Sequence, residues 1–347
     1  MAAPSKLSRR GIIRTSAAAA ALSWLGAGSR RASAAVERKR VLRMAHLADT
    51  HIQPQLAADK GVAAALNHLQ SQAVKPDLIL HTGDIIMDSF AAKEPRMRKL
   101  WDLWTSTMRS ELSLPIHYAL GNHDIWGWDK TKSETRGDEP SYGKKWVSDV
   151  LGLAKPYHSF DQGGWHFVAL DSVRPFGNSA YAAYLDEEQF AWLESDLAQV
   201  SPATPICVYS HIPIVTVTSH INSPVDPAST QPADTADVPR GKAGQKLYRP
   251  DRGDFLVSGA SQHGDFRRLK ALFAKYPNVR VALSGHTHLI DRVDYNNVSY
   301  LCGGAVSANW WKGVHQGECD FGYTLLDLYD DGSFDRTYVP FGWTARM

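Results

Sequence analysis

The chain has 347 residues, of which 44% are hydrophobic and 21% are charged, so it can bury a substantial core in one large domain or two smaller ones. No apolar run approaches the roughly 20 residues of a membrane-spanning helix and no block of like charges occurs, which excludes a stable membrane anchor and a charge-rich disordered chain. The three cysteines show no CxxC spacing, so we expect ordinary buried thiols, with a Cys302–Cys319 disulfide as the alternative if the chain is exported.

The N-terminal segment has the three parts of an export signal. Arg9 and Arg10 precede an alanine-rich apolar stretch at 17–28, and the small-residue site Ala32-Ser33-Ala34 follows. This order predicts a cleaved signal over residues 1–34 and a periplasmic or secreted location. The paired arginines resemble a twin-arginine signal, which the export machinery reads and which is not a membrane anchor. A disordered basic tail and a mitochondrial-type presequence are the alternatives.

Cleavage of residues 1–34 changes the charge of the chain. That segment holds six basic residues and no acidic ones, so its removal takes the formal net charge from +2 to −4. A nucleic-acid-binding protein needs a basic patch that survives processing, and no such patch remains in the sequence. We therefore expect no nucleic-acid partner.

Beyond residue 35, short aliphatic runs alternate with longer amphipathic stretches, which favours an α/β fold. The predicted strands, in chain order, are 41–47, 78–81, 116–120, 165–170, 206–209 and 279–283. The predicted helices are 61–74, 186–200 and 266–276. In the second helix, Asp186 and Gln189 have the spacing of a capping box.

Two long stretches and a tail complete the chain. Residues 125–145 and 212–262 show little periodicity, and loops of that length inside a compact domain are often functional. The tail at 323–338 predicts a closing β-hairpin. We interpret 35–347 as one catalytic domain that contains both loops and the hairpin.

Residues that can bind metal ions follow five of the predicted strands. They are Asp49 and His51, Asp84, Asn122, His211, and finally His286 and His288. Ligands of open α/β sheets bind beyond the carboxyl ends of strands, so these residues are expected to converge. Imidazole, carboxylate and amide donors without thiolate suit Mn, Fe, Co or Zn, and four imidazoles argue against Ca or Mg. Gly83, Gly121 and Gly285 precede three of the ligands and let the backbone turn sharply.

The series Asp49-x-His51, Gly83-Asp84, Gly121-Asn122-His123-Asp124, His211 and Gly285-His286-x-His288 resembles the calcineurin-like metallophosphoesterase family. Any one block is a weak signal, but five in order are specific. The resemblance implies a four-layer αββα sandwich of two mixed β-sheets flanked by helices, with a pair of divalent or transition metal ions (Mn, Fe or Zn) at the strand ends.

The resemblance also implies a role for each motif residue. It assigns Asp49, His51 and His288 to the first metal, Asn122, His211 and His286 to the second, and Asp84 to both. His123 corresponds to the residue that stabilises or protonates the departing oxygen. Asp124 corresponds to its orienting partner, which would raise the basicity of the imidazole.

The implied activity is hydrolysis of a small-molecule phosphate ester, either a phosphodiester or a phosphomonoester. Two ions that share Asp84 would lower the pKa of a bridging water, so that hydroxide attacks phosphorus in line with the leaving alcohol. A non-catalytic scaffold of the same fold and a binuclear amidohydrolase or lactonase are the alternative functions. The complete ligand set and His123 favour catalysis over a scaffold.

Two positions depart from patterns within the family. Met87 stands where purple acid phosphatases have a tyrosine ligand, which disfavours a tyrosinate–iron site. Trp126 stands where many cyclic-nucleotide phosphodiesterases have arginine, which counts against such a substrate. Four tryptophans near the motifs remain open between substrate stacking and core packing: Trp126, Trp128, Trp310 and Trp311.

Overall fold

The computed structural model describes residues 38–177, 180–221 and 259–346. Its first large sheet has the strand order β13-β12-β1-β2-β3. These strands are β1 (Arg40–Leu47), β2 (Leu78–His81), β3 (Ile116–Tyr118), β12 (Gly322–Tyr329) and β13 (Phe334–Pro340). Strands β1, β2 and β3 are parallel, so their carboxyl ends lie at one edge, whereas β12 is antiparallel to both β1 and β13.

The second large sheet has the order β10-β11-β9-β8-β5-β4. Its strands are β4 (His158–Gln162), β5 (Trp165–Leu170), β8 (Ile206–Ser210), β9 (Val279–Ser284), β10 (Ile290–Tyr295) and β11 (Val298–Gly303). Strands β5, β8, β9 and β11 are parallel, and the two edge strands are antiparallel to their neighbours. A separate hairpin pairs β6 (Val173–Phe176) with β7 (Ala180–Ala183).

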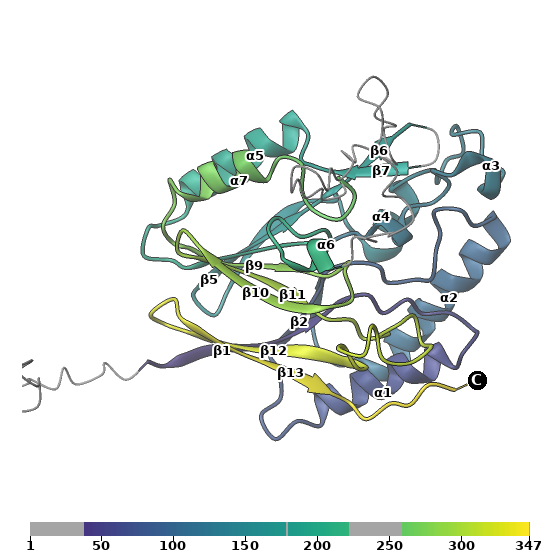
Figure 1. Cartoon of the computed structure of the whole chain (residues 1–347), viewed down its shortest axis with the longest axis horizontal. Helices are drawn as coiled ribbons and strands as arrows, with labels where there is room; N and C mark the ends of the chain where they lie inside the picture. The colour runs from purple at the N-terminus through teal and green to yellow at the C-terminus, as the bar shows by residue number, and fades with distance from the viewer. Residues whose placement is uncertain (1–37, 178–179, 222–258, 347) are drawn as a thin grey trace, which may run out of the picture. The chain divides into compact units, whose positions relative to one another are not determined.

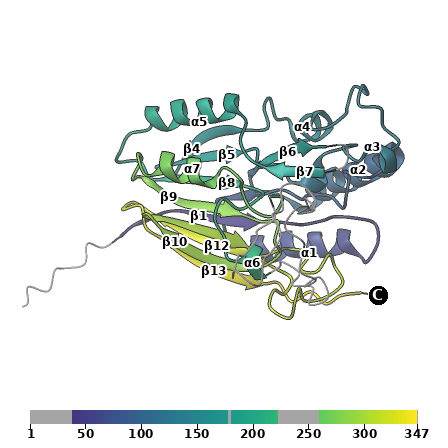
Figure 2. The same ribbon diagram turned by 45° about the horizontal axis from the view of Figure 1, so that its top comes forward.

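Helices cover the outer face of each sheet (Figures 1 and 2). The first sheet packs against α1 (Ala58–Gln70), α2 (Glu94–Glu111) and α4 (Lys145–Leu151), and the second against α5 (Glu187–Gln199) and α7 (Phe266–Phe273). The short elements are α3 (Lys130–Ser133), α6 (Thr218–Ile221) and the 3-10 turn η1 (Asn122–Asp124). The two sheets and their helices therefore form the expected four layers.

The pleat of β1 explains why this strand is apolar on both faces. Leu42 and Met44 belong to the core between the two sheets, where Phe167 of β5 also packs. Ala45 and Leu47 face the other way, into the core beneath the helices. Since successive side chains of a strand point to opposite faces, a strand covered on both sides reads as a nearly continuous apolar run.

Every strand that the sequence predicts is present, with ends that differ by one or two residues. The predicted cap of the second helix is also present, because the Asp186 carboxylate accepts a hydrogen bond from the Gln189 amide at 2.8 Å. Helix α2 and strand β10 were not predicted. The edge strand β10 has the sequence IDRVDY and is mostly exposed. It was not predicted because it lacks the run of apolar residues that marks a buried strand.

The three cysteines are buried and free, so the Cys302–Cys319 disulfide does not form. Among the described residues, no helix is both long and apolar enough to span a membrane. The predicted export signal at 1–34 and most of the predicted loop at 212–262 lie outside the described residues. The stretch at 125–145 is described and contains the single-turn helix α3.

Candidate metal centre

All seven predicted ligand residues come together at the carboxyl ends of five parallel strands. The first sheet supplies Asp49 and His51 after β1, Asp84 after β2 and Asn122 after β3. The second sheet supplies His211 after β8, and His286 and His288 after β9. The donor atoms of the histidines and aspartates among them fall into groups whose members lie within 4.8 Å of one another, and the Asn122 side-chain oxygen lies 3.0 Å from His211 Nε2. The site thus lies across the edges of both sheets.

One group consists of Asp49, His51 and His288, all buried. The Nε2 atoms of His51 and His288 are 3.0 Å apart. The nearer Asp49 oxygen lies 3.4 Å from His288 Nε2 and 3.9 Å from His51 Nε2. Two imidazole nitrogens and a carboxylate oxygen therefore lie close enough together to bind a single ion.

A second group consists of Asp84, His211 and His286. His211 Nε2 lies 3.1 Å from His286 Nδ1 and 3.0 Å from the side-chain oxygen of Asn122. The same nitrogen is 3.3 Å from Asp84 Oδ2. This arrangement brings together the residues that the family resemblance assigns to the second metal.

Asp84 lies between the two groups. Its Oδ1 accepts a hydrogen bond from the backbone amide of His123 at 2.8 Å, which fixes the carboxylate. Its Oδ2 lies 3.7 Å from His51 Nε2 and 3.3 Å from His211 Nε2. One oxygen is therefore held by the protein, and the other faces an imidazole of each group.

The hydrogen bonds of two imidazoles set which ring nitrogen faces the cluster. His211 Nδ1 donates to the carbonyl of Thr82 at 2.9 Å, and His288 Nδ1 donates to the carbonyl of Ala308. In the neutral ring, Nε2 then carries a lone pair that points inward, where it could bind an ion. His51 Nδ1 is buried without a hydrogen-bond partner, so His51 Nε2 can carry the proton and donate to His288 Nε2 at 3.0 Å when no ion is bound.

Five of the seven predicted ligands have positive φ, a region that non-glycine residues seldom adopt. The φ angles are 53° for Asp49, 41° for His51, 53° for Asp84, 70° for His286 and 56° for His288. Such strain persists only where the surrounding structure enforces it, and it concentrates at functional sites. The backbone therefore marks the same residues as the sequence motif does.

The glycines before the ligands provide room as well as a sharp turn. Gly83 has a φ of 94°, as the prediction required. A Cβ at Gly121 would lie 2.1 Å from an oxygen of Asp84, and one at Gly285 would lie 2.4 Å from an oxygen of Asp49. Any side chain at the last two positions would displace a carboxylate of the site.

Opposing effects set the ionisation of the cluster. Burial alone would raise the pKa of Asp84, but the charges of His211 and His123 outweigh it and hold the pKa well below the usual range. Burial, together with the nearby charge of His211, lowers the pKa of His286 to about 3. Burial likewise lowers the pKa of His51 well below its usual value. Burial lowers the pKa of His211, but the charge of Asp84 outweighs burial and raises the pKa to about 9. The cluster without an ion thus combines neutral imidazoles at His51 and His286 with a protonated one at His211, which would lose its proton on binding a metal ion.

His123 lies beside the two groups, half-buried, with Nε2 4.0 Å from Asp84 Oδ2. Its Nδ1 is 3.6 Å from the carboxylate of Asp88, an ion-pair distance. Burial lowers the pKa of His123, but the charge of Asp84 and the contact with Asp88 outweigh burial and raise the pKa to about 9. The imidazole therefore carries a proton at neutral pH while the cluster holds no ion.

The expected contact between Asp124 and the His123 ring is wrong. The Asp124 carboxylate is fully buried and accepts hydrogen bonds from the backbone amides of Asp84 at 2.9 Å, Ile85 at 2.7 Å and Gly121 at 2.8 Å. Asp124 thus fixes the loop of Asp84 to that of Asn122, and Asp88 takes the place beside His123. The one feature of the sequence that could have pointed to Asp88 is that it is a carboxylate four residues after Asp84.

Two histidines to which the sequence assigned no chemistry stabilise the ligand loops. The amide of Gly83 donates to His81 Nδ1 at 3.1 Å, so His81 Nε2 carries the proton and donates to the Thr50 hydroxyl. His46 Nε2 lies 2.9 Å from the Thr82 hydroxyl. These contacts hold the residues beside Asp49, Asp84 and His211 in place.

The four tryptophans divide between the core and the site. Trp126 is 3% exposed and donates to the carbonyl of Ala92, and Trp311 is fully buried. Trp128 and Trp310 are partly exposed. Core packing therefore accounts for the first two, and Trp128 packs at the edge of the small cluster around Ile125. Trp310 belongs to none of the core clusters of the described residues.

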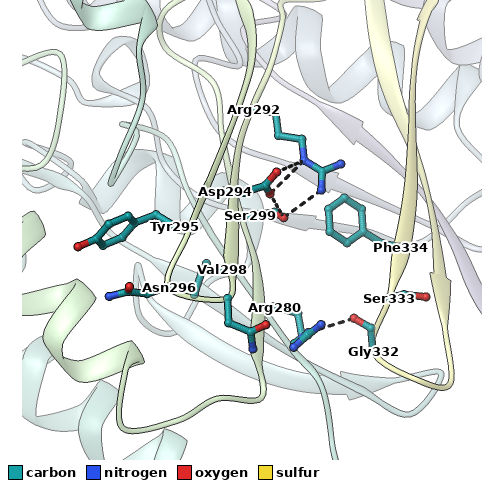
Figure 3. A pocket seen from close by; sticks show the side chains of 11 residues that line it. Arg280, Arg292, Asp294, Tyr295, Asn296, Val298, Ser299, Gly332, Ser333 and Phe334 are labelled. Atoms are coloured by element: carbon teal, nitrogen blue, oxygen red, sulfur yellow. Dashed lines mark hydrogen bonds and ion pairs between the residues drawn. The ribbon is translucent and has the colours of Figure 1, made fainter. Parts of the chain in front are cut away.

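A pocket of about 370 Å³ lies elsewhere, between the turns of two β-hairpins (Figure 3). Arg280, near the start of β9, lines this pocket, whereas His286 follows the end of that strand. At about 3.3 Å per residue the two residues are roughly 20 Å apart along the strand. Arg292 in this pocket is paired with Asp294 at 2.9 Å. The pocket is therefore separate from the ligand cluster.

A structure described as a dimetal phosphatase from Danio rerio superposes with a TM-score of 0.54 and 14% sequence identity, covering 87% of this chain and 97% of that one. It supports the fold. A 3′,5′-cyclic-nucleotide phosphodiesterase from Nostoc sp. is 22% identical over 90% of this chain and 94% of its own length. Purple acid phosphatase 22 from Arabidopsis thaliana is 29% identical over 46% of this chain and 34% of its own length.

The sequence model of one family, described as calcineurin-like phosphoesterase, matches residues 42–289. That span runs from β1 to the residue after His288 and includes all five motif blocks. The chain therefore belongs to the calcineurin-like phosphoesterase family and is a hydrolase of phosphoric ester bonds.

Proposed function

We propose that the chain hydrolyses phosphate esters with two divalent ions of the Mn, Fe or Zn class held at the ligand cluster. The observation that carries this proposal is the position of Asp84 Oδ2, which faces His51 of one group and His211 of the other. A single shared carboxylate oxygen is what a two-metal site requires. Asp49, His51 and His288 would bind one ion, Asn122, His211 and His286 the other, and Asp84 both.

The residues around the ions divide the chemistry between them. When bound, the ions would supply Lewis acidity and a lowered pKa for the attacking water. His123, protonated at neutral pH, gives its proton to the oxygen that leaves phosphorus in line with the attack. Asp88 orients the His123 ring through Nδ1 and keeps it protonated. No protein nucleophile is needed, so no phosphoenzyme forms.

Among phosphate esters, we propose a phosphodiester as the substrate. The support is the relative from Nostoc sp., described as a 3′,5′-cyclic-nucleotide phosphodiesterase, which aligns over 94% of its length. Trp126 counts against the cyclic-nucleotide class within the diesters, because it stands where many such enzymes have arginine, and a buried indole offers neither the charge nor the paired donors of a guanidinium.

Metal analysis joined to turnover tests the proposal. The protein should hold two ions per chain and hydrolyse an aryl phosphodiester faster than the matching aryl phosphomonoester. Two bound ions with no phosphoester turnover would support the scaffold alternative. Ester or amide hydrolysis far above phosphoester hydrolysis would support the amidohydrolase or lactonase. A faster monoester would overturn the choice of diester alone.

We further propose that residues 1–34 are an export signal of the twin-arginine type and that 35–347 form the exported catalytic domain. The support is the order of the basic, apolar and small-residue parts in the sequence. Changing Arg9 and Arg10 together to Lys should retain the precursor inside the cell. Normal export of that variant would instead indicate the general secretory route.

A further inference from the structure

The loop between β11 and β12, residues 304–321, is fastened to the ligand loop that follows β1. The amide of Ser307 donates to the carbonyl of Asp49 at 3.2 Å, and Trp311 Nε1 donates to the carbonyl of His51 at 3.1 Å. The carbonyl of Ala308 in the same loop accepts the Nδ1 proton of His288. The 304–321 loop is therefore positioned by the residues of the metal centre itself.

This loop places Trp310 over two of the proposed ligands. The indole centroid lies 4.4 Å from that of His288, with 33° between the planes, and 6.1 Å from that of His51. The ring is partly exposed, and both Trp310 and the buried Trp311 have positive φ, of 48° and 68°, in the region that non-glycine residues seldom adopt. The loop thus holds a partly exposed aromatic ring beside the proposed metal ligands.

The neighbouring residue shows that shielding the centre does not explain Trp310. Trp311 is fully buried, stacks on Phe321 at 5.6 Å and bonds to the backbone of the ligand loop. Trp310 has the same residue type and comes from the same loop, yet it keeps part of its surface open. His315 meets the Trp310 ring edge-on at 5.7 Å and lies 5.6 Å from His288. His315 is itself buried, so it supports the edge of the indole, and Trp310 is the partly exposed ring of this pair beside the first ligand group.

We propose that Trp310, with His315 at its edge, binds a flat aromatic group of the phosphoester, so that the substrates carry a nucleobase or an aryl ring. This inference rests on the proposed hydrolysis and names its substrate class. Stacking on an indole stabilises any base, whatever hydrogen-bond donors and acceptors it carries, since every base has a π-face. Trp310 and His315 both lie beyond the span 42–289 that the family model matches.

The test compares ligands that differ only in the ring. Adenosine 5′-monophosphate and ribose 5-phosphate share the sugar and the leaving oxygen, and bis(p-nitrophenyl) phosphate and methyl p-nitrophenyl phosphate share the leaving group. Trp310→Leu keeps an apolar side chain but removes the flat ring, and Trp310→Phe restores one. The matched control is Trp192→Leu. Trp192 is also partly exposed, but it lies on helix α5 and packs against Tyr157, not against the ligand groups.

Trp310→Leu should lower the ratio of kcat/KM for the ring-bearing over the ring-free substrate about tenfold in at least one pair, with Trp310→Phe recovering most of it. Trp192→Leu should leave both ratios unchanged. Ratios that Trp310→Leu leaves unchanged in both pairs would overturn the inference, as would an equal loss with Trp192→Leu.

A binding measurement separates this inference from the proposed function. Calorimetry of adenosine with the metal-free protein should show a dissociation constant that rises about tenfold in Trp310→Leu and stays unchanged in Trp192→Leu. If the metal-loaded wild type hydrolyses no phosphoester while this difference persists, the proposed function fails and the aromatic site stands. Equal adenosine binding by Trp310→Leu and the wild type would contradict the aromatic site.

Discussion

Removing the Asp124 side chain should destabilise the loops of the metal centre and should not act directly on proton transfer by His123. In Asp124→Ala, four buried backbone amides lose their acceptor, three at 2.7 to 2.9 Å in the native chain and that of Ile86 at 3.3 Å. Each unsatisfied buried donor costs about 1–3 kcal/mol, so the three short bonds alone give about 3–9 kcal/mol. An opposing effect reduces this value: burial and the nearby Asp84 charge raise the pKa of Asp124 to about 7, so removal also relieves a repulsion. We therefore expect a loss of about 3 kcal/mol, the low end of the range.

The assay is urea unfolding of the metal-free protein, followed by tryptophan fluorescence, so that stability is measured apart from metal binding. Asp88→Ala is the control, because Asp88 is 38% exposed and its loss should cost less than about 1 kcal/mol. If Asp124→Ala unfolds within about 1 kcal/mol of the wild type while its turnover collapses, Asp124 acts through His123 and our account of the loop is refuted.

Four further predictions concern the centre and the residues behind it. Asp84→Asn should weaken both metal sites in metal analysis, and two tightly bound ions in that variant would contradict the shared carboxylate. His123→Ala should slow poor leaving groups most while keeping both ions, and Asp88→Asn should shift the basic limb of the pH–rate profile to lower pH, because it removes a carboxylate that raises the His123 pKa; an unmoved limb counts against the pairing. Burial, with the charge of Arg336, lowers the pKa of His46 to about 3, so the folded state binds fewer protons than the unfolded state between about pH 6.5 and 3. The free energy of unfolding should therefore decrease as the pH is lowered through that window. His46→Gln should make this decrease smaller by up to about 1.4 kcal/mol per pH unit. Equal dependence of stability on pH in the variant and the wild type would show that His46 is protonated in the folded protein.

The strands and ligands were predictable because both depend on local sequence. A buried strand such as Leu78–His81 is an apolar run that ends in a glycine and a polar residue, and this pattern needs no partner to be read. The convergence of Asp84 with His211 follows from the rule that parallel strands end at one edge.

What the sequence left out depends on contacts between distant segments. The sequence places Asp124 beside His123, but the chain direction in η1 turns the Asp124 carboxylate toward the amides of the Asp84 loop. Trp310 and Trp311 are adjacent and identical in type, so only tertiary packing separates the buried ring from the exposed one. Helix α2 was missed although Pro95 marks its first turn and its buried residues recur at helical spacing.

Each ligand group draws residues from both sheets. His288 of the second sheet joins Asp49 and His51 of the first, and Asn122 of the first joins His211 and His286 of the second. An ion in either group would therefore be a cross-link between layers that are otherwise held by side-chain packing and hydrogen bonds, in a chain whose cysteines are all free. Binding energy at the centre would then add to the free energy of unfolding, by about 2.7 kcal/mol for an ion at a hundred times its dissociation constant. A chelator would act on this enzyme as a denaturant as well as an inhibitor.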